Sequence, residues 1–149
     1  MSGEPEYGVT IKQVPEQKVS SLRKRIPIRR LGRLFMELLR SLKGWPAGPA
    51  QAIYYDAGFD PTSVDVEVAF PVAEGGEKTI PGGEMACVTH VGEYSMLGSA
   101  YEALMTWMKR EGLAAAGPRR EVYLVGPGSG KDPEEYVTEI QVPVSVANR

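Results

Sequence analysis

The sequence holds 149 residues, of which 42% are hydrophobic, and it carries a formal net charge of −2. A chain of this length and ordinary composition forms one domain, or two small modules that share a core. The slightly acidic balance argues against nucleic acid as a direct partner, because phosphate binding requires a surplus of cationic side chains.

The chain contains one cysteine and one histidine, Cys87 and His90, so it can build neither an internal disulfide nor a Cys/His zinc site. We therefore expect no metal and no cofactor. The N-terminal sequence MSGEPEYG lacks the basic start and apolar run of a signal peptide. No stretch approaches the roughly 20 apolar residues that span a bilayer. These features predict a cytoplasmic protein without a membrane partner.

The predicted elements begin with two short strands at 7–14 and 17–22, which flank a turn at Pro15 and Glu16. A helix is predicted after Pro27 and ends before Gly44, since its apolar residues recur at the spacing of one helical face. That face consists of Ile28, Leu31, Leu34, Phe35, Leu38, Leu39 and Leu42. Strands are then expected at 50–55 and 63–72.

A glycine-rich segment at 73–83 is the predicted linker between two halves. Beyond it the order repeats: a strand at 84–91, a helix that begins within 92–95 and ends before Gly112, and strands at 121–125 and 138–144. The loop GPGSGKD at 126–132 lacks the Walker pattern of a phosphate-binding loop. We interpret it as a hairpin connection.

An acid and a proline recur in register in the two halves. The segment DVEVAFPV at 65–72 contains Glu67 four residues before Pro71, and TEIQVPV at 138–144 contains Glu139 four residues before Pro143. A duplicated module explains this recurrence, and such repeats usually pair about a pseudo-dyad and share one core.

The predicted fold is therefore of the α+β class. It has two repeated strand–helix–strand–strand modules, at about 7–72 and 84–146, with an antiparallel sheet and a central ligand groove. A groove at the interface of two repeats is a natural place for a small molecule.

Aromatic residues accompany the acids. Tyr54 and Tyr123 follow equivalent Gly-Pro pairs, and alternation places Glu121 on the same face as Tyr123. If the last two strands are neighbours, Glu139 and Tyr123 are expected to line one surface, with Tyr54 and Glu67 across the dyad. Aromatic rings around a carboxylate suit a flat, apolar cation. The alternative is a set of amphipathic strand residues with solvated hydroxyl and carboxylate groups.

Together these motifs resemble the GyrI-like small-molecule-binding domain family. The resemblance rests on KVSSLR and the Leu-rich helix, AIYYD, DVEVAFPV, THVGEY, the helix with Trp107, PRREVYL and TEIQVPV, and it covers residues 9–144. The chain is similar to the effector-binding domains of the BmrR and Rob regulators and to stand-alone family members. No DNA-reading segment precedes the domain, so we expect a stand-alone binder and not a transcription factor.

The resemblance implies a multidrug-type groove that takes hydrophobic, often cationic, aromatic compounds around one acid. It places that acid at Glu139, and it implies further ligand-binding residues, which are Glu67 and the aromatic wall of Tyr54, Tyr94, Tyr101, Trp107 and Tyr123. Two other functions remain open. As a hydrolase of cyclopropane-containing DNA-alkylating compounds, the protein would use Glu139 as the base and Tyr123 as a hydroxyl donor. As a gyrase-inhibitor-like module it would bind a protein partner.

Overall fold

The computed structural model describes residues 7–147. Within this range the structure contains, in order, β1 (Thr10–Val14), β2 (Gln17–Ile26), the 3-10 helix η1 (Ile28–Arg30), α1 (Leu31–Ser41), β3 (Ala50–Tyr54), β4 (Val64–Pro71), β5 (Lys78–Ile80), β6 (Gly83–Val91), η2 (Tyr94–Met96), α2 (Leu97–Arg110), β7 (Leu113–Ala115), β8 (Arg119–Val125), η3 (Pro133–Glu135) and β9 (Val137–Val146).

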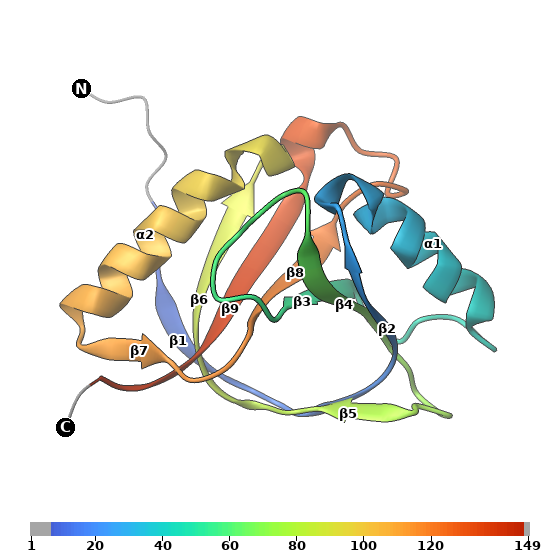
Figure 1. Ribbon diagram of the computed structural model, residues 1–149, viewed down its shortest axis with the longest axis horizontal. Helices are drawn as coiled ribbons and strands as arrows, with labels where there is room; N and C mark the ends of the chain where they lie inside the picture. The colour runs from blue at the N-terminus through green and yellow to red at the C-terminus, as the bar shows by residue number, and fades with distance from the viewer. Residues whose placement is uncertain (1–6, 148–149) are drawn as a thin grey trace.

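The strands form one curled antiparallel sheet in the order β1-β6-β9-β8-β3-β4-β2-β5, and β7 is added to β9. Leu38 of α1 packs with Ala52, and Leu104 of α2 packs with Ile140. Ala52 stands opposite Glu121, and Glu121 stands opposite Ile140. Residues opposite each other in antiparallel strands point to the same face, so both helices cover one face of the sheet. Figure 1 shows them on its two flanks, with the central strands between.

The ladder between β3 and β8 is symmetric about the pair Ala52–Glu121. Ala50 pairs with Tyr123 on one side of this centre, and Tyr54 pairs with Arg119 on the other. The pseudo-dyad that relates the two halves therefore passes through the middle of the sheet. Glu121 lies at this axis.

The two halves also share local contacts. The amide of Ala47 donates to the carbonyl of Pro71, and the amide of Ala116 donates to the carbonyl of Pro143, both at 2.7 Å. Each α-helix directly follows a 3-10 helix and begins with Leu-Gly. The predicted α+β fold with two repeated strand–helix–strand–strand modules is confirmed.

Two short strands and several element boundaries differ from the prediction, such as the end of β2, which lies at Ile26 and not at residue 22. The glycine-rich segment at 73–83 contains β5, and β7 follows α2; neither strand was predicted. Each consists of three residues, which is too short to show an alternating pattern. The first helix begins as η1 and becomes α-helical only at Leu31, since Pro27 is extended with ψ of 143°. It ends at Ser41, before the predicted stop.

The two ends of the sheet approach each other through two tight connections. Pro15 and Glu16 join β1 at one edge to β2 near the other, and Pro81 and Gly82 join β5 to β6. A Cβ atom on Gly82 would lie 2.3 Å from the Val14 carbonyl oxygen and 2.6 Å from the Glu16 nitrogen. Only glycine permits this backbone contact.

The face of the sheet away from the helices carries two matching ion pairs. Nζ of Lys78 on β5 lies 2.8 Å from both carboxylate oxygens of Glu67, and Nζ of Lys12 on β1 lies 2.5 Å from Glu139. Both lysines belong to related segments, KTIP and KQVP. Each ion pair joins an edge strand to a strand farther inside the curled sheet.

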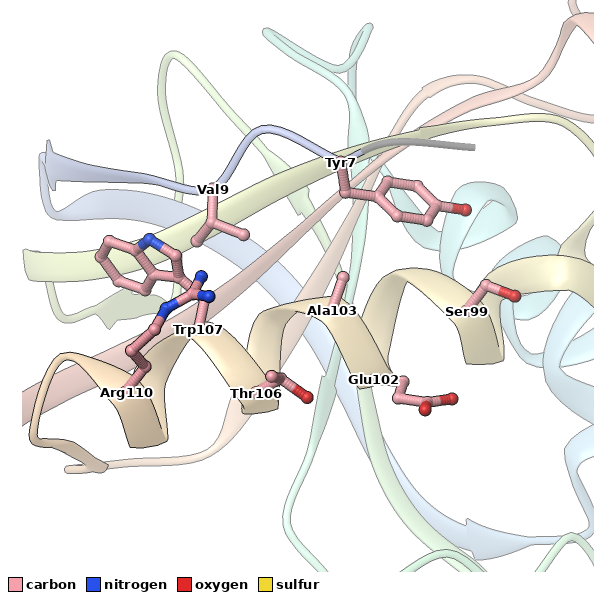
Figure 2. Close-up of a pocket in the computed structure, with 8 residues that line it drawn as sticks. All are labelled: Tyr7, Val9, Ser99, Glu102, Ala103, Thr106, Trp107 and Arg110. Atoms are coloured by element: carbon pink, nitrogen blue, oxygen red, sulfur yellow. The ribbon is translucent and has the colours of Figure 1, made fainter. Parts of the chain in front are cut away.

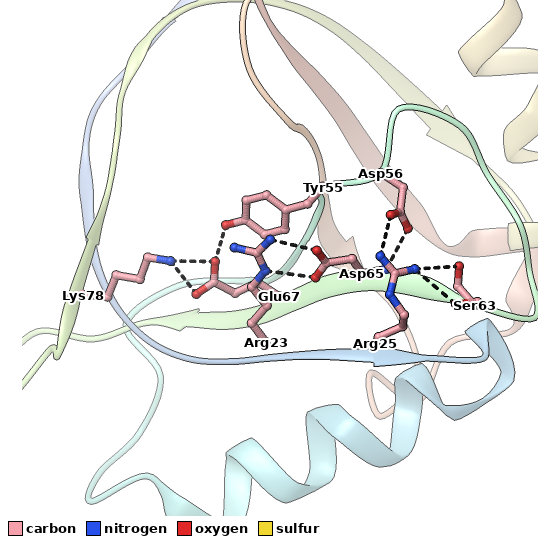
Figure 3. Close-up of polar contacts among 8 residues, drawn as sticks. All are labelled: Arg23, Arg25, Tyr55, Asp56, Ser63, Asp65, Glu67 and Lys78. Atoms are coloured by element: carbon pink, nitrogen blue, oxygen red, sulfur yellow. Dashed lines mark hydrogen bonds and ion pairs between the residues drawn. The ribbon is translucent and has the colours of Figure 1, made fainter.

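Glu67 is the more fully enclosed of the two acids. It also accepts hydrogen bonds from Ser21, at 2.7 Å, and from Tyr55. Figure 3 shows Glu67 between Tyr55 and Lys78, beside the ion pair of Arg23 with Asp65. Burial alone would raise the pKa of Glu67, but the bonds from Lys78, Tyr55 and Ser21 hold this pKa below its usual range.

Replacement of Gly82 by alanine is expected to lower the free energy of unfolding by about 2 kcal/mol or more, because the obstructing atoms belong to the backbone. Chemical denaturation measures this change. Gly44→Ala is the control, since its Cβ would meet nothing within 4 Å. Equal stability of the two variants would contradict the close approach at Gly82.

Glu67→Gln is expected to lower the free energy of unfolding at neutral pH by about 1–3 kcal/mol, since it weakens the bonds of a buried carboxylate. Because folding lowers the pKa of Glu67, the ionised side chain adds to the free energy of unfolding above the unfolded-state pKa of about 4.3. This contribution is lost as the pH falls through the pKa of Glu67 in the folded state. The difference between wild type and variant should therefore shrink in acid.

The exposed Glu37, which pairs with Lys24 at 3.2 Å, provides the control for that experiment. Glu37→Gln should change the free energy of unfolding by less than about 1 kcal/mol at any pH, as is usual for surface pairs. Denaturation curves at neutral and acidic pH measure both effects. A difference for Glu67→Gln that is constant with pH would argue against its stabilising charge.

Candidate functional site

A large cavity lies on the helix-covered face, above the centre of the sheet. Its volume is about 1470 Å³, and residues from both helices, both central strands and the loops that follow those strands line it. The two halves contribute equivalent positions, such as Leu31 with Leu97 and Gly32 with Gly98. The cavity therefore straddles the pseudo-dyad, as a ligand groove between repeats should.

Glu121 is the buried acid of this cavity. Its Oε2 accepts a hydrogen bond from the Tyr101 hydroxyl at 2.5 Å, and its Oε1 accepts one from the Tyr123 hydroxyl at 2.7 Å. Among residues 7–147, no side-chain nitrogen of Lys, Arg or His lies within 4.0 Å of a Glu121 carboxylate oxygen. The carboxylate thus has neutral donors for both oxygens but no cationic partner.

Burial keeps the surrounding tyrosines protonated. It raises the pKa of Tyr101, Tyr123 and Tyr54 above the ordinary value, and the nearby Glu121 raises them further. Burial also raises the pKa of Tyr94 to about 12. At physiological pH these side chains are neutral, so Tyr101 and Tyr123 remain hydrogen-bond donors to Glu121.

Aromatic rings form a continuous wall around Tyr123. The ring of Phe35 on α1 meets Tyr123 edge-on, with centroids 5.8 Å apart, and Phe70 meets Phe35 in the same way at 5.9 Å. On the other side the Tyr94 ring lies 5.6 Å from Tyr123. Such edge-to-face contacts stabilise aromatic pairs beyond the area they bury.

The cavity is chemically asymmetric although its backbone is symmetric. The fifth residue of α1 is Phe35, whereas the fifth residue of α2 is Tyr101. At the centre of the sheet Ala52 stands opposite Glu121. At these two pairs of equivalent positions the first half supplies apolar side chains, and the second half supplies the carboxylate and one of its hydroxyl donors.

Arg119 adds a positive charge to the same wall. It shares a strand face with Glu121 and Tyr123, and it lines the cavity. Its guanidinium carbon lies 4.7 Å from the centroid of the Tyr54 ring and 5.5 Å from that of Tyr101. Both distances are typical of cation–π contacts.

Four of the aromatic residues predicted for the site do line this cavity. They are Tyr54, Tyr94, Tyr101 and Tyr123, and they come from β3, η2, α2 and β8. The structure thus brings together residues that lie far apart in the sequence.

The register of β8 and β9 contradicts the expectation that Glu139 and Tyr123 line one surface. The two strands are neighbours, but Glu139 stands opposite Val122, and Tyr123 stands opposite Thr138. Glu139 consequently points away from the helices, where it accepts hydrogen bonds from Lys12 and, at 2.6 Å, from Gln141. Glu67 points to that same face, so neither acid lines the cavity.

Trp107 also lies apart from the cavity. It lines a shallower groove of about 320 Å³ between α2 and the segment that precedes β1. Figure 2 shows Trp107 at one end of this groove with Val9 and Arg110, and Tyr7 toward the other end. The predicted aromatic wall therefore loses Trp107, and Phe35 and Phe70 take part instead.

Residues 7–147 contain neither a cluster of metal ligands nor a membrane-spanning helix. No group of three or more His, Cys, Asp or Glu side chains could hold a metal ion in this part of the chain. No helix there is long and apolar enough to cross a membrane.

Known structures share the fold of this chain. The chain superimposes on the crystal structure of the EcmrR C-terminal domain with a TM-score of 0.82 and 28% sequence identity, and the match covers 95% of this chain and 99% of that one. It also matches EcmrR in a complex with DNA, with a TM-score of 0.84 and 28% identity, and there it covers 95% of this chain but spans only 58% of EcmrR.

A hydrolase from Listeria innocua shares the fold at 15% identity, with a TM-score of 0.72 and coverage of 96% of this chain and 94% of that one. The comparison with curated protein sequences finds no match. The family model of the GyrI-like small molecule binding domain matches residues 8–145. The chain therefore belongs to the GyrI-like small-molecule-binding domain family.

Proposed function

We propose that this domain binds hydrophobic, often cationic, aromatic small molecules in the cavity, with Glu121 as the counter-charge. The observation that carries the proposal is the environment of Glu121. A buried carboxylate that lacks a cationic partner is costly, and its two tyrosine donors compensate for only part of the lost hydration. A ligand cation would supply the missing charge.

The rest of the cavity suits the remainder of such a ligand. Drug-sized pockets occupy roughly 300–1000 Å³, and the cavity, at about 1470 Å³, exceeds that range. Phe35, Phe70 and neighbouring aliphatic residues offer a broad apolar surface opposite the acid. We expect a flat ligand to place its charge on the Glu121 side and its rings toward α1.

Family membership supports the same reading, because the matched domain is a small-molecule-binding domain. The similarity to the EcmrR C-terminal domain extends over nearly the whole of both chains. Multidrug-type binding by this protein is our inference from the width of the cavity and from its one acid without a cationic partner, Glu121.

Glu121→Gln is expected to weaken binding of the lipophilic cation rhodamine 6G by about tenfold or more, equivalent to about 1.4 kcal/mol. The amide keeps the size of the side chain but removes its charge. Fluorescence titration of wild type and variant measures the change. Equal affinities would remove Glu121 from the centre of the site.

Glu139→Gln is the matched control for that titration. It makes the same chemical change on the opposite face of the sheet, where Lys12 already pairs with the acid. Its affinity for rhodamine 6G should remain within about twofold of wild type, since Glu139 does not line the cavity. A loss confined to Glu139→Gln would instead favour Glu139 as the ligand's counter-charge.

Glu121→Gln is further expected to leave the free energy of unfolding unchanged or to raise it by up to about 1 kcal/mol. An unpaired buried charge costs stability, and functional sites commonly retain such groups. Chemical denaturation without ligand measures this change. A loss of several kcal/mol would show that Glu121 is structural, and the proposal would then lose its main support.

A further inference from the structure

The cavity already contains a cation of its own. Arg119 lies over the faces of Tyr54 and Tyr101, and Tyr101 is also one of the two residues that donate hydrogen bonds to Glu121. No carboxylate oxygen of an Asp or Glu within residues 7–147 lies within 4.0 Å of an Arg119 guanidinium nitrogen. Arg119 is therefore held by the side chains of Tyr54 and Tyr101 and not by a salt bridge.

The charged residues of the cavity lining show why the position of Arg119 matters for a charged ligand. Three formally charged residues line the cavity, namely Asp56, Arg119 and Glu121. Asp56 is paired with Arg25, which lies outside the lining, at 2.9 Å. Arg119 and Glu121 remain as one positive and one negative group, which balance each other across Tyr101.

We propose that Arg119 is an internal competitor for the cation position: its guanidinium occupies tyrosine faces that a cationic ligand would use. This inference rests on the proposed function of the cavity. A ring face that already holds a cation is not free for a second one, and two like charges in a cavity of low dielectric repel each other strongly.

A cationic ligand must therefore displace the Arg119 side chain or bind beside it against repulsion. Arginine has the length and rotamer freedom to move aside, and it binds aromatic faces better than an ammonium does. Only cations that stack well and also approach Glu121 would bind tightly. Arg119 would thus set the selectivity of the cavity, by rejecting small or weakly stacking cations.

The same geometry predicts opposite responses to ligands of opposite charge. Tetraphenylphosphonium and tetraphenylborate have nearly the same shape and carry one positive and one negative charge, respectively. Arg119→Met keeps a long side chain but removes the charge. We expect this variant to bind tetraphenylphosphonium about tenfold more tightly than wild type, and tetraphenylborate more weakly. Isothermal titration calorimetry measures each affinity.

Two variants act as controls. Arg119→Lys retains the charge, so its affinity for tetraphenylphosphonium should stay within about threefold of wild type. Arg40→Met removes an exposed charge from α1, outside the cavity lining, and should leave both affinities unchanged. Thermal unfolding of every variant checks that the comparison involves folded protein.

The outcomes separate this inference from the proposed function. Suppose that wild type binds tetraphenylphosphonium and Glu121→Gln weakens that binding, but Arg119→Met binds the cation equally or more weakly. The internal-competitor role then fails and the binding function stands. If Arg119→Met changes the affinities for both ions in the same direction, the charge of Arg119 does not determine binding. That result would also overturn the inference. If neither wild type nor Arg119→Met binds the cation, the proposed function itself fails.

Discussion

The antiparallel ladder between β3 and β8 is the constraint on which the rest of the structure depends. It joins the two modules edge to edge, so the two helices reach the same face and leave a space between them. The central pair of that ladder, Ala52 and Glu121, forms part of the sheet beneath this space. A shift of the register by one residue would turn Glu121 to the other face and remove the acid from the cavity.

The buried carboxylates on the two faces of the sheet have different partners. On the face away from the helices, Glu67 and Glu139 each have a lysine from an edge strand, and they fasten the curled sheet. On the helix-covered face, Glu121 has only tyrosine hydroxyls. The first arrangement neutralises charge within the protein, whereas the second leaves Glu121 without a cationic partner. In the proposed function, a structural role falls to the acids of one face and a binding role to the acid of the other.

The fold could be predicted from the sequence because its strongest signals are local and occur twice. The apolar stripe of the first helix, the Gly-Pro pairs and the acid–proline segments all marked equivalent elements. The same recurrence directed the prediction to Glu139, whereas the structure places both Glu67 and Glu139 on the face away from the cavity, each paired with a lysine. Glu121 does not repeat, and its alternation with Tyr123 was the only local signal for it. The inward position of Phe35 and Phe70 depends on the packing of α1 over the sheet, which no local pattern specifies.

The position of Glu121 on the pseudo-dyad has a consequence for how such a site can be encoded. Two identical subunits that met about a true twofold axis would place two carboxylates face to face at this position, or none. Repulsion between them would force one to take up a proton. In a single polypeptide that contains both halves, the two equivalent positions are encoded separately, so a substitution can change one of them alone. Covalent fusion of the halves is thus what permits a lone acid at the centre of a symmetric frame.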